Sequence, residues 1–155
     1  MDVNDIKLGQ KATVNGKSYN VLAKVLYAAL GNDYKYYKVF LTGGGLFIYD
    51  ARDQGKLSAF GMLIAPLDLD VKNPADEINY NGRVYKKDTG IEYERVVAVE
   101  FGELSDAEGE CWWVNYTAED GSWLSPGLVS YDGRRADYFG EDISKYNIEF
   151  VKESV

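Results

Sequence analysis

The sequence predicts an all-β protein, and three observations carry that prediction. Apolar and polar residues alternate along most of the chain, which is the period of a strand with one buried face. Aromatic residues make up 14% of the chain, and they favour pleated, half-buried surfaces. Sixteen glycines, several in Asn-Gly and Asp-Gly pairs, supply turns between strands. At 155 residues the chain has the usual size of one domain, so we expect a single all-β domain over residues 1–155.

The first half begins with a hairpin pattern around Asn15-Gly16. An Asn-Gly pair tolerates the two positive φ angles of a type I′ turn, so the flanking alternating segments are expected to pair with each other. The glycines 43–45 predict a second turn further along. The strands predicted for this half are residues 11–14, 19–27, 34–41, 46–49 and 56–64.

The second half follows a segment of irregular composition, residues 65–76, which contains two of the three prolines. Beyond this connector, Tyr80-Asn81-Gly82 repeats the earlier Val14-Asn15-Gly16, and the alternation starts again. All three tryptophans of the chain lie in residues 110–124, which predict an aromatic hairpin. The other strand patterns of this half are residues 91–101, a hairpin over 128–139, and residues 146–151.

The similar order of patterns predicts an internal duplication. Spacing matches Tyr37, Val39 and Leu41 of the first half to Trp112, Val114 and Tyr116 of the second. We therefore expect two similar halves of about four strands, residues 6–64 and 77–151, joined by the connector. They would form a duplicated antiparallel sheet or a barrel-like sandwich, and the sequence leaves the strand order open.

Composition excludes several classes of function. The chain has no histidine, which removes Ser-His-Asp and Cys-His catalysis and His-ligated metal sites. Its one cysteine, Cys111, allows no intramolecular disulfide and indicates a small apolar side chain. A net charge of −8 argues against nucleic-acid binding. We find no signal peptide or membrane-spanning pattern, and we expect a cytoplasmic protein without a cofactor.

The tryptophan hairpin supplies the predicted partner-binding face. The match to the first half places Trp112 on the buried face and Trp113 on the outward face. An outward tryptophan is either covered by the other half of the protein or part of a contact surface, where this residue is over-represented. The side chains expected to extend such a surface are Tyr36, Phe40 and Tyr131. The pair Arg134-Arg135 either forms ion pairs with nearby carboxylates or binds a carboxylate of the partner.

Acidic residues give two weaker hypotheses. The loop at 102–110 carries closely spaced carboxylates, with Asp106, Glu108 and Glu110 as candidate ligands for a hard cation such as calcium. The loop lacks the residue order of an EF-hand, and a solvated turn explains the same composition. Paired carboxylates also serve glycoside hydrolysis, for which the formal candidates are Glu110, Asp120 and Glu141.

Three features together resemble the bacterial family called domain of unknown function 4178. They are the Asn-Gly-x-x-Tyr starts, an aromatic strand before a Trp-Leu return strand, and the ending Phe139-Gly140-Glu141-Asp142-Ile143. The resemblance spans most of the chain. It implies a small β-rich protein, often encoded near envelope-stress or polyamine-related genes, with no established catalytic residue.

These observations favour a non-catalytic interaction module that binds a protein partner, or a second copy of itself, through an aromatic face. The alternative is a carrier of a small or lipid-like ligand, with inward aromatic residues lining a cavity. A carboxylate-based hydrolase is the weaker third hypothesis.

Overall fold

The computed structural model describes residues 2–31, 34–50, 56–88, 90–103, 109–130 and 132–151. These residues confirm the all-β prediction, because they form antiparallel strands and, apart from short 3-10 turns, no helix. The strands are β1 (Lys11–Val14), β2 (Lys17–Ala29), β3 (Lys35–Leu41), β4 (Gly45–Asp50), β5 (Lys56–Ile64), β6 (Glu77–Tyr80), β7 (Arg83–Lys87), β8 (Glu92–Phe101), β9 (Cys111–Trp113), β10 (Tyr116–Thr117), β11 (Trp123–Ser125), β12 (Gly127–Val129), β13 (Asp137–Gly140) and β14 (Ile148–Phe150). The 3-10 turns are η1 (Val3–Asp5), η2 (Thr42–Gly44) and η4 (Ile143–Lys145).

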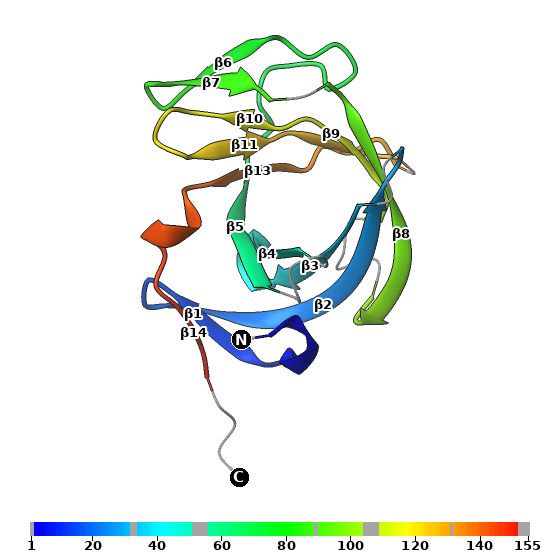
Figure 1. The fold of residues 1–155 in the computed structure, drawn as a ribbon, viewed down its shortest axis with the longest axis vertical. Helices are drawn as coiled ribbons and strands as arrows, with labels where there is room; N and C mark the ends of the chain where they lie inside the picture. Colours follow the sequence, from blue (N-terminus) through cyan, green and yellow to red (C-terminus); the bar gives the residue numbers. More distant parts are fainter. Residues whose placement is uncertain are drawn as a thin grey trace.

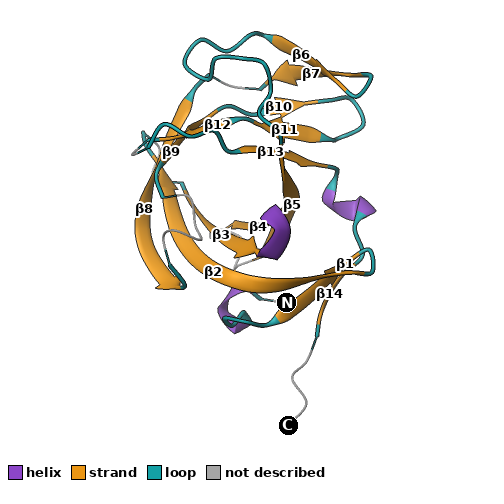
Figure 2. Cartoon of the chain, turned by 180° about the vertical axis from the view of Figure 1, so that it is seen from behind, coloured by secondary structure: helices purple, strands orange, loops and turns teal. Residues whose placement is uncertain are grey.

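One large antiparallel sheet contains these strands, in the order β12-β9-β8-β2-β3-β4-β5-β13-β11-β10-β7-β6, while β1 pairs with β2 and β14. The sheet curls round the interior of the molecule (Figure 1), and the view from behind shows the same curl (Figure 2). It is not closed into a barrel. An isolated bridge between Leu128 and Arg135, with a 2.9 Å hydrogen bond from Ala136 N to Gly127 O, joins β12 to the segment before β13.

Both Asn-Gly turns form as hairpins. Asn15 and Gly16 have φ angles of 50° and 83°, and Asn81 and Gly82 have 49° and 78°, the positive pair that a type I′ turn requires. The strands pair directly across each turn, at Val14 with Lys17 and at Tyr80 with Arg83. The turn prediction is therefore confirmed at Asn15-Gly16, and its repeat has the same geometry.

The structure does not confirm a duplication into two halves. Strands of the first part pair with strands of the second, since β2 pairs with β8 and β5 with β13. The segment matched to β3 is divided into β9 and β10, whereas β3 itself is one continuous seven-residue strand. The connector 65–76 has no helix or strand, but Val71 within it is 2% exposed and packs in a core cluster.

The second part of β2 and most of β3 and β4 are buried on both faces, which explains the apolar residues on both sides of their patterns. A bulge in β2 falls between Val21 and Ala23. Before the bulge, Tyr19 packs in a cluster with β1, η1 and β14, and after it Tyr27 packs in a cluster on the inner side of the curl. The N-terminal segment and β14 therefore cover the outer face of this part of the sheet.

No helix in the part of the chain that the structure describes is long and apolar enough to span a membrane.

Candidate functional site

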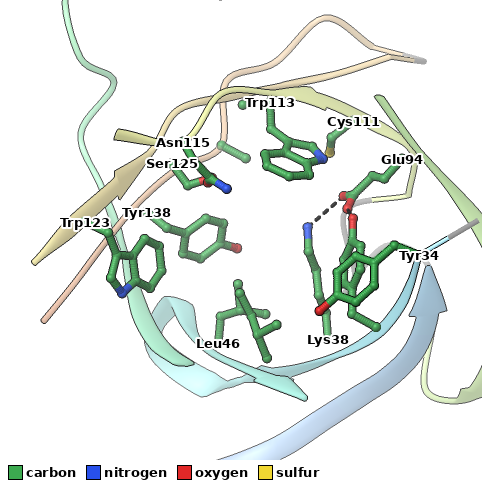
Figure 3. A pocket seen from close by; sticks show the side chains of 14 residues that line it. Tyr34, Lys38, Leu46, Glu94, Cys111, Trp113, Asn115, Trp123, Ser125 and Tyr138 are labelled. Carbon is green, nitrogen blue, oxygen red and sulfur yellow. Dashed lines mark hydrogen bonds and ion pairs between the residues drawn. The ribbon is translucent and has the colours of Figure 1, made fainter. Parts of the chain in front are cut away.

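A cavity of about 210 Å³ lies inside the curl of the sheet. Its walls come from β3, β4, β8, β9, β11, β12 and the segment ending in β13, so strands far apart in the sequence meet there (Figure 3). The lining residues are Tyr34, Tyr36, Lys38, Leu46, Ile48, Glu94, Cys111, Trp113, Asn115, Trp123, Ser125, Gly127, Ala136 and Tyr138. Most of this wall is aromatic or aliphatic, with a few polar groups, as in small-molecule sites.

The alternation of side chains along each strand determines which residues face the cavity. Residues two apart point to the same face of a strand, so Tyr36 and Lys38 of β3 face the cavity together. Cys111 and Trp113 of β9 do the same from the opposite wall. Glu94 of β8 pairs directly with Cys111, which fixes which face of β9 is turned inward.

Glu94 is the centre of a buried polar network. Its side chain is fully buried, and its Oε1 lies 2.7 Å from Lys38 Nζ. The Tyr36 hydroxyl donates to the other carboxylate oxygen. Burial and the neighbouring carboxylate raise the pKa of Tyr36 well above its usual range, so this tyrosine stays protonated as a donor. Both carboxylate oxygens are thereby satisfied, which a buried charge requires.

The Lys38 ammonium faces the cavity. Its side chain is 12% exposed, and Figure 3 shows its amino group directed at the Glu94 carboxylate, to which a dashed line joins it. Nζ lies 4.9 Å from the ring centroid of Tyr27 and 5.9 Å from that of Tyr36, within the range of cation–π attraction. Among the described residues that line the cavity, Lys38 is the cation, and its counter-ion Glu94 is the more deeply buried member of the pair.

The two adjacent tryptophans are inverted relative to the sequence prediction. Trp113 lines the cavity and its Nε1 is buried, whereas Trp112 is 39% exposed and packs on Tyr93 with ring centroids 4.5 Å apart. The prediction was wrong because it took the phase of β9 from Tyr37 and Val39 of β3. Both faces of β3 carry buried residues, so that strand provided no reliable phase.

Trp123 forms another part of the wall, held by two glycines. A Cβ on Gly61 would lie 2.6 Å from the Trp123 ring, and one on Gly140 would lie 2.5 Å from it. The indole thus rests directly on the backbone of β5 and β13, the two strands that carry these glycines. This contact fixes the position of the ring at one end of the cavity.

Two other residues of the predicted partner face are buried. Tyr36 is 5% exposed and lines the cavity, and Phe40 is 4% exposed in the same core cluster. Their predicted surface position is wrong, because the inner side of β3 faces the curl of the sheet. Tyr131, the third of the residues expected to extend the face, lies outside the described residues.

The arginine pair contacts carboxylates of its own chain. Arg135 makes two hydrogen bonds to Asp137, at 3.1 and 2.7 Å, and a third of 2.7 Å to Leu69 O. Asp137 also accepts a hydrogen bond of 2.8 Å from Leu67 N of the connector. The Arg135–Asp137 ion pair therefore holds the connector against β13. Arg134 is half-exposed and lies 3.7 Å from Asp132.

The acidic hypotheses find little support in the geometry. Asp106 and Glu108 lie outside the described residues, and the backbone carbonyl of Glu110 accepts from Ser130 N. Within the described ranges, no three His, Cys, Asp or Glu side chains are grouped to hold a metal ion.

Two of the three hydrolase candidates do come together, on the surface. Arg83 bridges Asp120 at 3.2 Å and Glu141 at 3.6 Å. Hydrogen bonds from Ser122 lower the pKa of Asp120, which keeps it ionised and unsuited to act as a general acid.

A second, more open cavity of about 360 Å³ adjoins the first. The two share Ile48, Asn115, Trp123 and Ser125 as lining residues, so they meet at the Trp123 wall. Three carboxylates, Asp88, Glu141 and Asp142, line this outer cavity. A molecule entering from this side would pass an acidic surface before it reached the aromatic interior.

Comparison with known protein families identifies a match over most of the chain. The model of a protein family described as Domain of unknown function (DUF4178) matches residues 7–127. No curated protein and no solved structure matches the chain. The matched range includes most strands that line the cavity, from β3 to the first residue of β12.

Proposed function

The chain belongs to the family described as Domain of unknown function (DUF4178), whose description assigns no activity, and we propose that it is a non-catalytic protein that binds a small molecule in the aromatic cavity. The observation that carries this proposal is the cavity itself, with a charged network placed in its wall. A carrier or a sensor would use such a site in the same way.

The size of the cavity argues for a ligand. Protein interiors are normally packed without large voids, because empty space forfeits dispersion contacts. A cavity of about 150 Å³ is enough to hold benzene. The cavity here is about 210 Å³, which suits one ring with a small substituent.

Contacts within the protein order the wall of the cavity. Glu94, Lys38 and Tyr36 hold one another in place, and the Trp123 ring is fixed on Gly61 and Gly140. Groups that protein contacts hold in place lose little conformational entropy on binding. This order supports a binding role for the cavity.

A cavity-filling variant tests the proposal. Ser125 lines the cavity, so Ser125→Leu places an apolar side chain in the space that a ligand would occupy. We expect phenol and indole to give saturable shifts in an NMR titration of the wild-type protein. In Ser125→Leu their affinity should fall about tenfold or more, since a methyl-sized clash in a packed site costs roughly 1–3 kcal/mol.

The matched control is Ser18→Leu, which makes the same change at an exposed position of β2. This variant should bind both probes as the wild type does. Thermal unfolding of both variants checks that they are folded. Absence of saturable binding to the wild type, or equal binding by both variants, would rule out the cavity as a site.

A second function is favoured by the exposed Trp112, which packs on the half-buried Tyr93. Trp112 is 39% exposed, and Val97 and Val99 of the neighbouring strand β8 are 37% and 39% exposed. An exposed tryptophan is typical of protein contacts. We propose that this face, with Trp112 in place of Trp113, contacts a second copy of the chain.

If so, sedimentation velocity should show a concentration-dependent dimer of the wild type, and Trp112→Ser should shift it towards monomer by about tenfold in dissociation constant. Trp113→Leu, which changes the inward neighbour, should leave the association unchanged. A wild type that stays monomeric at all concentrations would refute self-association.

A further inference from the structure

We propose that the ligand of the aromatic cavity is a neutral molecule, about one ring in size, whose carbonyl or hydroxyl oxygen accepts a hydrogen bond from Lys38 Nζ. This inference rests on the proposed function, since it specifies the chemistry of the molecule that the same cavity binds.

The two members of the ion pair are unequally buried. Both line the cavity, but the Glu94 side chain is 0% exposed while that of Lys38 is 12% exposed, so the ammonium is the member with surface left to contact a ligand. An ammonium carries three N–H donors, and it can serve Glu94 and a ligand oxygen together. The polar contact that this end of the cavity offers is therefore a charge-assisted donor.

A cationic ligand group is excluded by Lys38. A positive ligand group at the inner end would stand next to Lys38 in a site shielded from water, where like charges repel strongly. Glu94 also lines the cavity, but both of its oxygens are already used, one by Lys38 and one by Tyr36. Among the described lining residues, its carboxylate has no exposed surface left to compensate a second cation.

An anionic ligand is disfavoured by the acidic surface of the outer cavity. The adjoining outer cavity is lined by Asp88, Glu141 and Asp142, and the chain has a net charge of −8. Arg83 near Glu141 offsets part of this charge. An anion would still approach through a negative surface and lose its hydration on entry.

A purely apolar ligand is disfavoured by the same ammonium. Such a molecule would cover the exposed part of the Lys38 side chain with apolar surface, and desolvating an ammonium without a new hydrogen bond carries a large penalty. A carbonyl or hydroxyl oxygen avoids that cost. The aromatic wall formed by Tyr34, Tyr138 and Trp123 accommodates the rest of the molecule.

Four molecules of closely similar size and shape test the inference. They are acetophenone as the neutral acceptor, cumene as the apolar analogue, benzoate as the anion and benzamidine as the cation. In NMR titrations of the wild-type protein, acetophenone should bind about tenfold or more tightly than each of the others, the factor expected for one hydrogen bond to a charged group.

The variant that removes the donor is Lys38→Met combined with Glu94→Gln, which leaves no unpaired buried charge. Acetophenone should lose its advantage over cumene in this protein. Lys35→Met makes the same change of side chain at an exposed position of the same strand, and it should preserve the preference.

The outcomes separate this inference from the proposed function. Tightest binding of cumene, benzoate or benzamidine, or an acetophenone preference that survives in the double variant, overturns the neutral-acceptor inference while the cavity remains a binding site. If neither these four molecules nor phenol and indole bind, both fail together.

Discussion

Replacing Lys38 with methionine should lower the free energy of unfolding by about 3–5 kcal/mol, the cost of leaving a buried charge without its partner. Methionine keeps an apolar chain of similar length but removes the ammonium that lies 2.7 Å from Glu94 Oε1. The Glu94 carboxylate, which is fully buried, would retain only the Tyr36 hydroxyl as a partner. Chemical denaturation monitored by circular dichroism measures the change.

The double variant Lys38→Met with Glu94→Gln provides the control. An amide at position 94 is neutral and still accepts from Tyr36, so the double variant should lose less than about 2 kcal/mol, in line with neutral replacements of buried ion pairs. Lys35→Met, at an exposed position of the same strand, should change stability by less than about 0.5 kcal/mol. If the single and double variants are equally destabilised, the buried charge is not what Lys38 compensates.

The local features of the fold could be predicted from the sequence because their causes are local. The turn at Asn15-Gly16 depends on the φ angles that two adjacent residues tolerate, and it forms as expected. Alternation identified most strands for the same reason. Pairing of β2 with β8 joins distant segments, and no pattern within either strand specifies its partner.

The alternation of polar and apolar residues could not locate the cavity, because Lys38 and Glu94 stand at positions typical of solvent-exposed strand residues. Lys38 and Glu94 each occupy one alternate position of a strand, where a charged residue normally indicates the solvent face. In this fold the curl of the sheet makes that face an interior one. The charges reveal their role only when β3 and β8 both pair with β2, which brings Lys38 and Glu94 together on one face of the sheet.

The tryptophan prediction failed for a related physical reason. Phase can be read from a strand only when one face is wet, and β3 carries buried residues on both faces. Using β3 as the template therefore assigned Trp112 and Trp113 to the wrong sides. A signal was present in the sequence, since Cys111 is a small apolar residue in phase with Trp113, and free cysteine is among the most buried residue types.

The second large effect on stability is expected at Gly61 and Gly140, the two glycines against which the Trp123 ring packs. Gly140→Ala should destabilise the protein by about 3 kcal/mol, because the added Cβ meets two obstacles and overpacking of this kind costs roughly 1–3 kcal/mol for each site. One obstacle is the Trp123 ring at 2.5 Å, and the other is the backbone carbonyl oxygen of Phe60. Neither glycine has a positive φ, so the clash and not backbone strain is the cause.

Gly61→Ala tests the contact with the Trp123 ring without the backbone clash. Its Cβ would lie 2.6 Å from the Trp123 ring, while the nearest backbone atom, Phe139 O, is at 3.5 Å. In a Trp123→Leu background the cost of Gly61→Ala should therefore fall from about 2 kcal/mol to less than about 0.5 kcal/mol, a coupling expected of residues in direct contact. Gly140→Ala should keep most of its cost there, because the Phe60 carbonyl remains. Denaturant unfolding of the single and double variants gives both couplings. Equal costs in the two backgrounds for Gly61→Ala would show that the indole does not rest on β5, and the wall between the two cavities would then have to be held in another way.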